Sequence, residues 1–374
     1  MEKEKIRLPY IDNLRAMIIM IVVMVHTGVT YSNMGSWYYY EKTTLEMGAS
    51  IFFGIFLSTT QAFDMSFLFM VAGYFVPVSY DVKGASRFTK DRLFRLGVPL
   101  VIYMLIIHQL TLKLAYPQTN LVEYYINSIK KLSIFSGSGP LWFVLVLLIF
   151  SAFYLLFRLV FKKEISLRQP KINTGNVLLL TLMITIPAFL IRILMPMGSA
   201  WMNIQFPFFS GYIIMFIIGI IAKRLELFKK ITLKAGIKWL LIFFTAGYGF
   251  FGALVVLGGL LNGDISVISG GLKWQSFAFA LWESFGCVTI SIGLIGTFRN
   301  CFNKQNRFQK FLSDNCFGVY VFHTPILVAI SVSFKSWAVH PFIKFISVGI
   351  LAIVASYIFT SLVRKIHFLK KLFT

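Results

Sequence analysis

Long apolar runs alternate with short polar segments along the whole chain. Each run is about 20 residues long, the length that crosses a hydrocarbon core of roughly 30 Å. The runs occupy residues 11–31, 60–80, 97–114, 140–161, 176–195, 206–222, 236–261, 275–297, 317–334 and 342–363. No polar domain separates them. The pattern predicts an all-α, polytopic integral membrane protein with ten spans, in which residues 1–374 form one membrane domain.

The composition agrees with a membrane protein. Hydrophobic residues make up 57% of the chain and charged residues only 13%, unlike an ordinary soluble domain. A net charge of +22 would suggest nucleic acid as the partner of a soluble protein, but basic residues of membrane proteins gather in cytoplasmic loops. With the amino terminus inside, 28 of the 36 Lys and Arg residues fall on the inner side. We therefore expect both termini in the cytoplasm and no nucleic-acid partner.

The first apolar run is longer than the core of a secretory signal and lacks a small-residue cleavage site after it, so we expect it to be retained. Cys287, Cys301 and Cys316 form no CxxC pair. This spacing indicates neither a disulfide framework nor a structural zinc site, and we expect no metal.

Ionisable side chains inside membrane-spanning helices are costly and usually functional. The first span contains Arg15 near the inner surface and His26 deep in the membrane. Their separation of eleven residues makes about three helical turns, so they share one face with roughly 16 Å between their Cα atoms. This shared helix face predicts a functional site that extends from the inner surface to the depth of His26. The alternative is a histidine that only hydrogen-bonds a neighbouring helix.

Two acidic residues come close to the expected depth of His26. Asp64 lies in the outer half of the second span, and Glu283 lies about 12 Å below the outer edge of the eighth. Either carboxylate would orient a catalytic His26 or stabilise its imidazolium form. Alternatively, both are structural partners of polar groups on adjacent helices.

Arginines gather at the inner end of the spans. Arg92 and Arg95 have i, i+3 spacing at a depth close to that of Arg15, and paired guanidinium groups suit phosphate binding. They predict a site for a phosphate-rich ligand, unless they only enforce orientation. Tyr320 and His323 are expected in the inner half of the ninth span.

Trp142 and Arg192 are expected at the outer ends of the fourth and fifth spans. Trp142 fits the interfacial aromatic belt, although it could also support a sugar ring. Arg192 would either snorkel to the surface or recognise an acceptor. His108, His340 and His367 show no supporting pattern.

Five motifs, taken together and in order, resemble the bacterial membrane acyltransferase-3 family over essentially the whole chain. Arg15, ten residues and His26 match its first motif. The segment FLFMVAGYF at 67–75 resembles its F-F-x-x-S-G-Y, with Ala72 in place of serine and Gly73 retained for close packing. RLFR at 92–95 matches its R-x-x-R, and GPLWFVLVLL and NCFGVYVFHTP resemble its L-W-F segment and its late Tyr-His helix. Within the family, the glucan biosynthesis protein C-like branch is most similar.

The resemblance implies transfer of an acyl group, acetyl or succinyl, from cytoplasmic acyl-coenzyme A to a hydroxyl of an extracytoplasmic glycan. It places the protein in the bacterial cytoplasmic membrane. His26 would be catalytic as a general base or a transient acyl carrier, assisted by Asp64 or Glu283. The donor would be bound by Arg15, Arg92, Arg95, Tyr320 and His323, and the acceptor would contact Trp142 and Arg192.

A secondary transporter for a sugar or an anionic metabolite is the alternative, because polar groups at mid-membrane depth and inner arginines also serve transport. An inactive assembly partner would be indicated by loss of the histidine, which is retained. The expected partners are membrane lipid, acyl-coenzyme A and a carbohydrate acceptor, and a homo-oligomer is left open. The sequence does not specify the acyl group or the acceptor.

Overall fold

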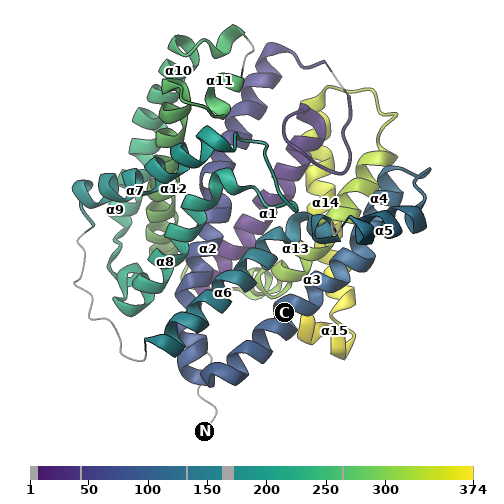
Figure 1. Cartoon of the computed structure of the whole chain (residues 1–374), viewed down its shortest axis with the longest axis horizontal. Coiled ribbons are helices and arrows are strands. Elements are labelled where there is room, and N and C mark those ends of the chain that lie inside the picture. The colour runs from purple at the N-terminus through teal and green to yellow at the C-terminus, as the bar shows by residue number, and fades with distance from the viewer. Residues whose placement is uncertain (1–6, 43, 132–133, 162–171, 263–264, 374) are drawn as a thin grey trace.

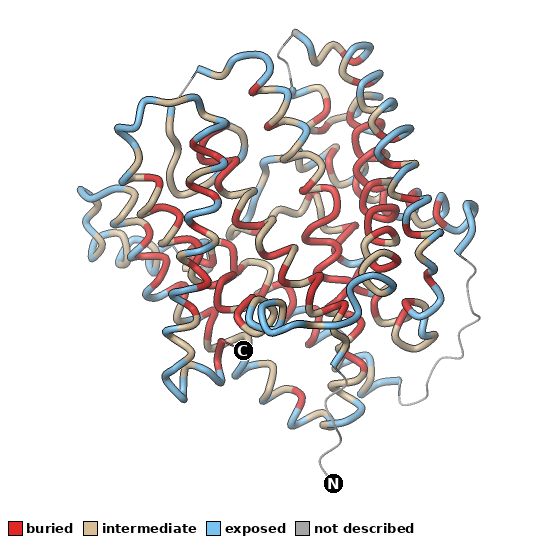
Figure 2. The backbone as a smooth tube through the Cα atoms, turned by 180° about the vertical axis from the view of Figure 1, so that it is seen from behind, coloured by how far each residue is buried: buried red, intermediate tan, exposed pale blue. Residues whose placement is uncertain are grey.

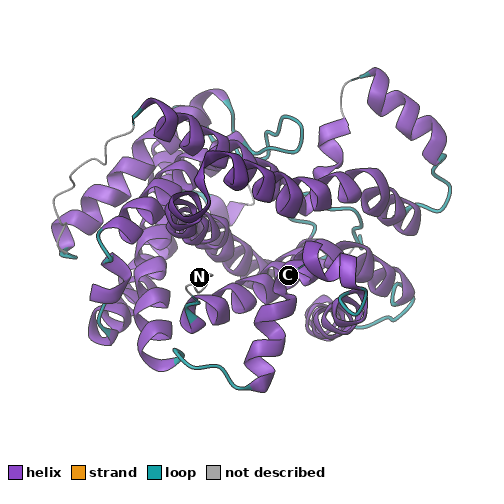
Figure 3. Ribbon diagram, turned by 90° about the horizontal axis from the view of Figure 1, so that it is seen from below, coloured by secondary structure: helices purple, strands orange, loops and turns teal. Residues whose placement is uncertain are grey.

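The computed structural model describes residues 7–42, 44–131, 134–161, 172–262 and 265–373. Within these ranges the regular elements are helices and short helical turns, without strands (Figure 3). The α-helices are α1 (Pro9–Ser32), α2 (Met47–Arg92), α3 (Val98–Ile102), α4 (His108–Ala115), α5 (Leu121–Lys130), α6 (Trp142–Val160), α7 (Thr174–Leu194), α8 (Phe209–Arg224), α9 (Leu233–Ile242), α10 (Tyr248–Leu257), α11 (Ser266–Ser269), α12 (Trp274–Cys301), α13 (Arg307–Ser333), α14 (Pro341–Val363) and α15 (His367–Leu372). Short π-helical or 3₁₀ segments are η1 (Leu93–Gly97), η2 (Tyr103–Ile107), η3 (Ile134–Leu141), η4 (Phe206–Phe208), η5 (Leu227–Lys230), η6 (Phe243–Gly247) and η7 (Leu260–Asn262).

Among the described residues, nine helical segments are long and apolar enough to cross a membrane. The longest, Met47–Ala115, contains two of the ten predicted spans, 60–80 and 97–114. Gly84 interrupts the helix between them with a φ of +70°, a conformation that favours glycine. Figure 1 shows the blue ribbon turning back at the bottom of the bundle, where the amino terminus also lies. The prediction of an all-α polytopic membrane protein is confirmed.

Three helices form the centre of the bundle. In α12, 78% of the most apolar window is buried inside the protein, and in α1 and α13 the share is 61%, whereas Leu233–Leu257 buries only 17%. Accordingly, most of the buried residues, red in Figure 2, lie in the middle of the molecule. A helix that faces lipid needs only apolar side chains, but a central helix can carry polar groups that meet other polar groups. His26, Glu283 and His323 all lie on these three helices.

Glycines allow α2 and α8 to cross at close range. A Cβ atom added to Gly73 would lie 2.1 Å from the backbone oxygen of Phe216, and one added to Gly219 would lie 2.0 Å from that of Met70. Neither position can hold a side chain unless the helices move apart. Small residues at such crossings are the usual way for membrane helices to pack, and the close packing expected at Gly73 is observed.

The start of α13 differs from the prediction. The hydropathy pattern places the span at 317–334, but the helix begins at Arg307. Asn306 and Gln309 form a reciprocal capping box, in which each side chain accepts a hydrogen bond from the other residue's backbone amide. Such a cap stabilises a helix start in a polar segment. The helix is therefore about three turns longer than its apolar part.

Candidate active site

His26 of α1 meets His323 of α13 in the centre of the bundle. The Nε2 atom of His323 lies 3.1 Å from the Nδ1 atom of His26, and the Nδ1 atom of His323 lies 2.8 Å from the backbone oxygen of Tyr320. His323 is fully buried and His26 partly buried. The expectation that His323 lies in the inner half of its span is not met, because His323 lies past the middle of α13, at the level of His26. The capping box extends α13 by about three turns, so His323 lies roughly 24 Å from the helix start.

The chain of hydrogen bonds determines which nitrogen of His26 is unprotonated. The carbonyl of Tyr320 can only accept, so His323 donates through Nδ1–H. With both rings neutral, the Nε2 atom of His323 must then accept from the Nδ1–H of His26. The Nε2 atom of His26 is left with its lone pair. A neutral imidazole in this tautomer can accept a proton from a substrate hydroxyl.

Trp37 covers one face of His26. It belongs to the α1–α2 loop (residues 33–46), which begins where Asn33 adopts the left-handed conformation after α1. The rings of Trp37 and His26 are stacked, with centroids 3.8 Å apart and planes inclined by 18°. Stacking leaves the edge of the imidazole, and hence its nitrogens, free to react. The loop lies at the end of the bundle opposite the amino terminus (Figure 1).

Two side chains, those of Tyr38 and Glu41, anchor the α1–α2 loop to the bundle. The hydroxyl of Tyr38 lies 2.5 Å from the Nδ1 atom of His108 and 3.3 Å from the hydroxyl of Tyr103. Glu41 forms an ion pair with Lys344 of α14, whose side chain is 3% exposed. Separating a buried ion pair leaves an unpaired charge and costs the folded state free energy. These contacts therefore restrain the loop and, with it, the indole of Trp37.

The GPLWF segment, at 139–143, packs against the same group of aromatic residues. Gly139 has a φ of +48°, and a Cβ atom there would lie 2.6 Å from the hydroxyls of both Tyr38 and Tyr103. The hydroxyl of Tyr320 donates to the backbone oxygen of Pro140. The segment therefore connects the α1–α2 loop to the turn of α13 that precedes His323.

The structure does not bring Asp64 or Glu283 into contact with His26. Glu283 forms an ion pair of 2.5 Å with Arg192, and Asp64 accepts the backbone N–H of Met65 at 2.5 Å. The hydrogen-bonding partner of His26 is another histidine, so the interpretation of these acids as orienting groups for His26 finds no contact to support it. Glu283 has the structural partner on an adjacent helix that the alternative interpretation allowed, whereas the partner of Asp64 is a backbone N–H of its own helix.

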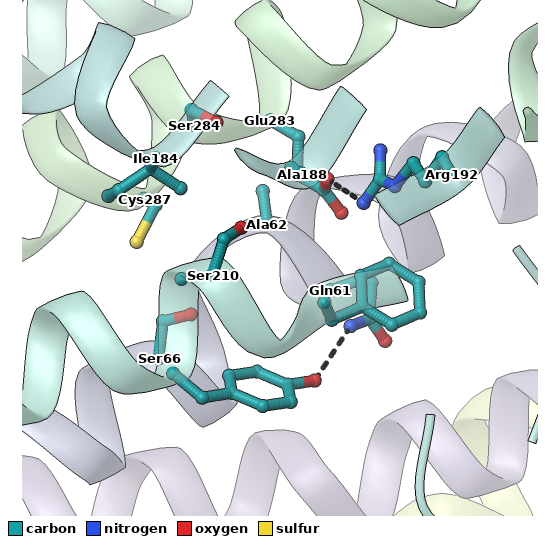
Figure 4. A pocket seen from close by; sticks show the side chains of 13 residues that line it. Gln61, Ala62, Ser66, Ile184, Ala188, Arg192, Ser210, Glu283, Ser284 and Cys287 are labelled. Atoms are coloured by element: carbon teal, nitrogen blue, oxygen red, sulfur yellow. Dashed lines mark hydrogen bonds and ion pairs between the residues drawn. The ribbon is translucent and has the colours of Figure 1, made fainter. Parts of the chain in front are cut away.

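Arg192 does not snorkel: its side chain is fully buried. Its Nε atom donates to the backbone oxygen of Pro207 at 3.2 Å, and its guanidinium lies over the ring of Phe208 at 5.0 Å. The ion pair of Arg192 with Glu283 lines a small cavity between α2, α7, α8 and α12, together with Ser66 and Ser210 (Figure 4). At about 20 Å³ for the centres of water-sized molecules, the cavity has room for a water.

Arg15, Arg92 and Arg95 lie toward the helix ends. The side chain of Arg15 is 43% exposed and lies 4.0 Å from Asp12. Arg95, with a side chain 44% exposed, forms an ion pair of 3.0 Å with Asp91 in the preceding turn. Arg92 is less exposed and stacks over Phe88 at 5.2 Å. Guanidinium groups suit an anionic ligand, and the role of these three arginines as donor contacts stays a prediction.

Trp142 begins α6 and packs among aromatic rings of other helices. Its ring centroid lies 5.4 Å from that of Tyr212 and 6.4 Å from that of Phe69. These contacts do not test its proposed role in acceptor binding. Tyr320 contacts Pro140 and His323, and its role in donor binding also stays a prediction.

Sequence reasoning missed Trp37, Tyr38 and His108. Trp37 and Tyr38 fall in the aromatic run WYYY just beyond the first span, which is where an interfacial belt is expected. His108 belongs to none of the motifs found in the sequence. The dense aromatic run immediately after a helix with a buried histidine was the only signal available.

The match to a known family covers nearly the whole chain. A family model described as an acyltransferase domain, that of the acyltransferase-3 family, matches residues 8–361. Comparisons with curated proteins and with solved structures found no match. Among the described residues, no group of three His, Cys, Asp or Glu side chains is placed to hold a metal ion. With its membrane-spanning helices and its matched residues, the chain belongs to the acyltransferase-3 family and is a membrane acyltransferase.

Proposed function

We propose that this acyltransferase moves an acyl group from cytoplasmic acyl-coenzyme A to a hydroxyl of an extracytoplasmic carbohydrate, with His26 as the general base. The contact that carries the proposal is the hydrogen bond between His26 and His323, because it leaves the Nε2 atom of His26 unprotonated in a central helix. The family membership supplies the reaction class.

In the proposed reaction, Nε2 of His26 removes the proton of the acceptor hydroxyl as its oxygen attacks the thioester carbonyl carbon. A new C–O bond forms, the C–S bond breaks, and the coenzyme A thiolate leaves. The imidazolium then returns the proton to the thiolate, so His26 is regenerated. His323 holds Nδ1 of His26 throughout, which keeps the reactive nitrogen in one orientation.

The arginine end of the bundle would bind the donor. Coenzyme A carries several phosphates, and Arg15, Arg92 and Arg95 supply guanidinium groups near the helix ends. About 16 Å separates Arg15 from His26 along α1, so the pantetheine arm has to extend into the bundle. This arrangement requires the arginine end to face the cytoplasm. A reporter fused after residue 374 should therefore behave as cytoplasmic and one inserted at Ser36 as extracytoplasmic.

The acceptor would approach from the end that carries the α1–α2 loop. The resemblance to the glucan biosynthesis protein C-like branch favours a glucan or a related envelope carbohydrate, with acetyl or succinyl as the acyl group and the bacterial cytoplasmic membrane as the location. Mass spectrometry of envelope glycans from cells with and without the gene should reveal an added acyl mass that depends on the gene.

An assay in liposomes separates the enzyme from the transporter alternative. With purified protein, acyl-coenzyme A outside and a glycan acceptor, we expect free coenzyme A to be released in step with acylation of the glycan. Movement of substrate across the membrane without thioester cleavage would contradict the proposal and favour a carrier.

A further inference from the structure

The stack of Trp37 on His26 bears on the charge that His26 acquires during the reaction. In many hydrolases a carboxylate beside the catalytic histidine stabilises the imidazolium. Here the carboxylates of Asp64 and Glu283 have other partners, and the partner of His26 is the neutral ring of His323. A positive charge on His26 therefore needs another source of stabilisation in a membrane interior.

The indole of Trp37 has the geometry to provide it. The face of an aromatic ring carries negative electrostatic potential, and tryptophan attracts cations most strongly of the aromatic side chains. Its centroid lies 3.8 Å from that of His26, with nearly parallel planes, whereas His323 is 6.1 Å away. The attraction is absent while His26 is neutral and grows as the proton transfers, so it acts on the transition state more than on the ground state.

The surrounding contacts keep the indole in this position. The ring of Tyr38 meets that of Trp37 edge-on, with centroids 5.3 Å apart, and Tyr38 is hydrogen-bonded to His108. The backbone N–H of Trp37 donates to the hydroxyl of Tyr40. On the far side of the loop, the ion pair between Glu41 and Lys344 fixes it to α14. A platform fixed before the reaction avoids the free-energy cost of reorganisation.

We propose that Trp37 is a positioning residue of the acyl transfer: its indole holds the imidazole plane of His26 and stabilises the imidazolium that forms when His26 accepts the proton of the acceptor. The inference rests on the proposed role of His26. It assigns a function to the α1–α2 loop, which contributes no residue to the family motifs found in the sequence.

Fluorinated tryptophans at position 37 give the sharpest test, since each fluorine weakens the negative electrostatic potential of the ring face and leaves the shape of the ring nearly unchanged. We expect log kcat to fall steadily from one to four fluorines, with an unchanged KM for acyl-coenzyme A. Removing the ring in Trp37→Leu should lower kcat by roughly 2- to 30-fold, the range of a cation–π contact, and Trp37→Phe should recover part of the loss. The same fluorinated residues at Trp201, which is 59% exposed, serve as the control.

Three results would overturn the inference. A flat fluorine series would show that the ring face does not stabilise charge. A loss in Trp37→Phe equal to that in Trp37→Leu, together with a flat series, would assign the role to the indole N–H instead. Equal losses at Trp201 would indicate a general effect of fluorination. His26→Ala, assayed beside these variants, keeps the two proposals apart: if it retains the wild-type rate, the proposed function itself fails, whereas an inactive His26→Ala with a flat series removes only the inference about Trp37.

Discussion

The Nε2 atom of His323 lies 3.1 Å from the Nδ1 atom of His26, which joins the first and the penultimate long helices of the bundle through two imidazole rings. Because the Nδ1 atom of His323 donates to the carbonyl of Tyr320, both rings have a defined tautomer. Replacing His323 therefore changes the orientation and proton distribution of His26 and does not remove the reacting group itself.

We expect His323→Leu to lower kcat by about 10²-fold or more, since a well-positioned base contributes roughly 10² to 10⁴. An unchanged KM for acyl-coenzyme A would assign His323 to the orientation of His26, and a raised KM would assign it to the donor contact that the resemblance implies. His323→Gln should recover part of the rate, because an amide can donate to Tyr320 and accept from His26. Steady-state kinetics of the purified variants measure both effects. Equal activity of the Leu variant and the wild type would show that the contact has no role in the reaction.

Arg92 and Arg95 should bind the donor. Each alanine variant should lose a charge-assisted contact worth roughly 1.5 to 3 kcal/mol, which is about a tenfold to a hundredfold loss of affinity for an acyl-coenzyme A analogue. Lysine should rescue poorly because it lacks a planar fork of donors. Arg87→Ala is the matched control, an exposed arginine on the same helix. Calorimetry measures the donor affinity. If both alanine variants bind the donor as tightly as the wild type, these arginines only set the orientation of the protein in the membrane.

Arg192 and Glu283 are both buried, so each should need the other as a countercharge for the fold to be stable. Arg192→Met leaves Glu283 without its countercharge and should cost about 3 to 5 kcal/mol of unfolding free energy. Adding Glu283→Gln should restore much of that loss. Thermal unfolding in detergent would measure both, with Lys273→Met at an exposed position as the control. A double variant that is no more stable than Arg192→Met would argue against the pairing.

The crossing of α2 and α8 should not tolerate a methyl group at Gly73. Gly73→Ala places a carbon 2.1 Å from the backbone oxygen of Phe216, and overpacking of this kind costs roughly 1 to 3 kcal/mol or more. Gly54→Ala, on the same helix with no atom within 4 Å of the added carbon, should have little effect. The yield of folded protein in size-exclusion chromatography compares the two, and equal yields would contradict the packing seen here.

Hydropathy was sufficient to predict the long apolar helices but not their polar ends. The membrane length of an apolar run defines a span, which is why 11–31 and 342–363 agree with α1 and α14 within two residues. The start of α13 depends on the capping box of Asn306 and Gln309, which lies outside the apolar run. That error in the helix start also misplaced His323 in depth.

The candidate site was predictable only where residues share one helix. Arg15 and His26 follow from helical spacing alone. The contact of His26 with His323 depends on which helices are neighbours, and that is decided by packing across the whole bundle, including the crossing at Gly73 and Gly219. Glu283 shares the expected depth of His26, yet its partner is Arg192, because depth defines a plane and not a position within it.

The central claim is that the Nε2 atom of His26 acts as the base in acyl transfer. The most direct measurement is a single-turnover assay of His26→Ala in liposomes, with donor binding and coenzyme A release measured on the same sample. Donor binding should be unchanged because the arginines are intact, while acyl transfer to the glycan should fall by about 10² to 10⁴. Transfer at the wild-type rate in His26→Ala would contradict the account.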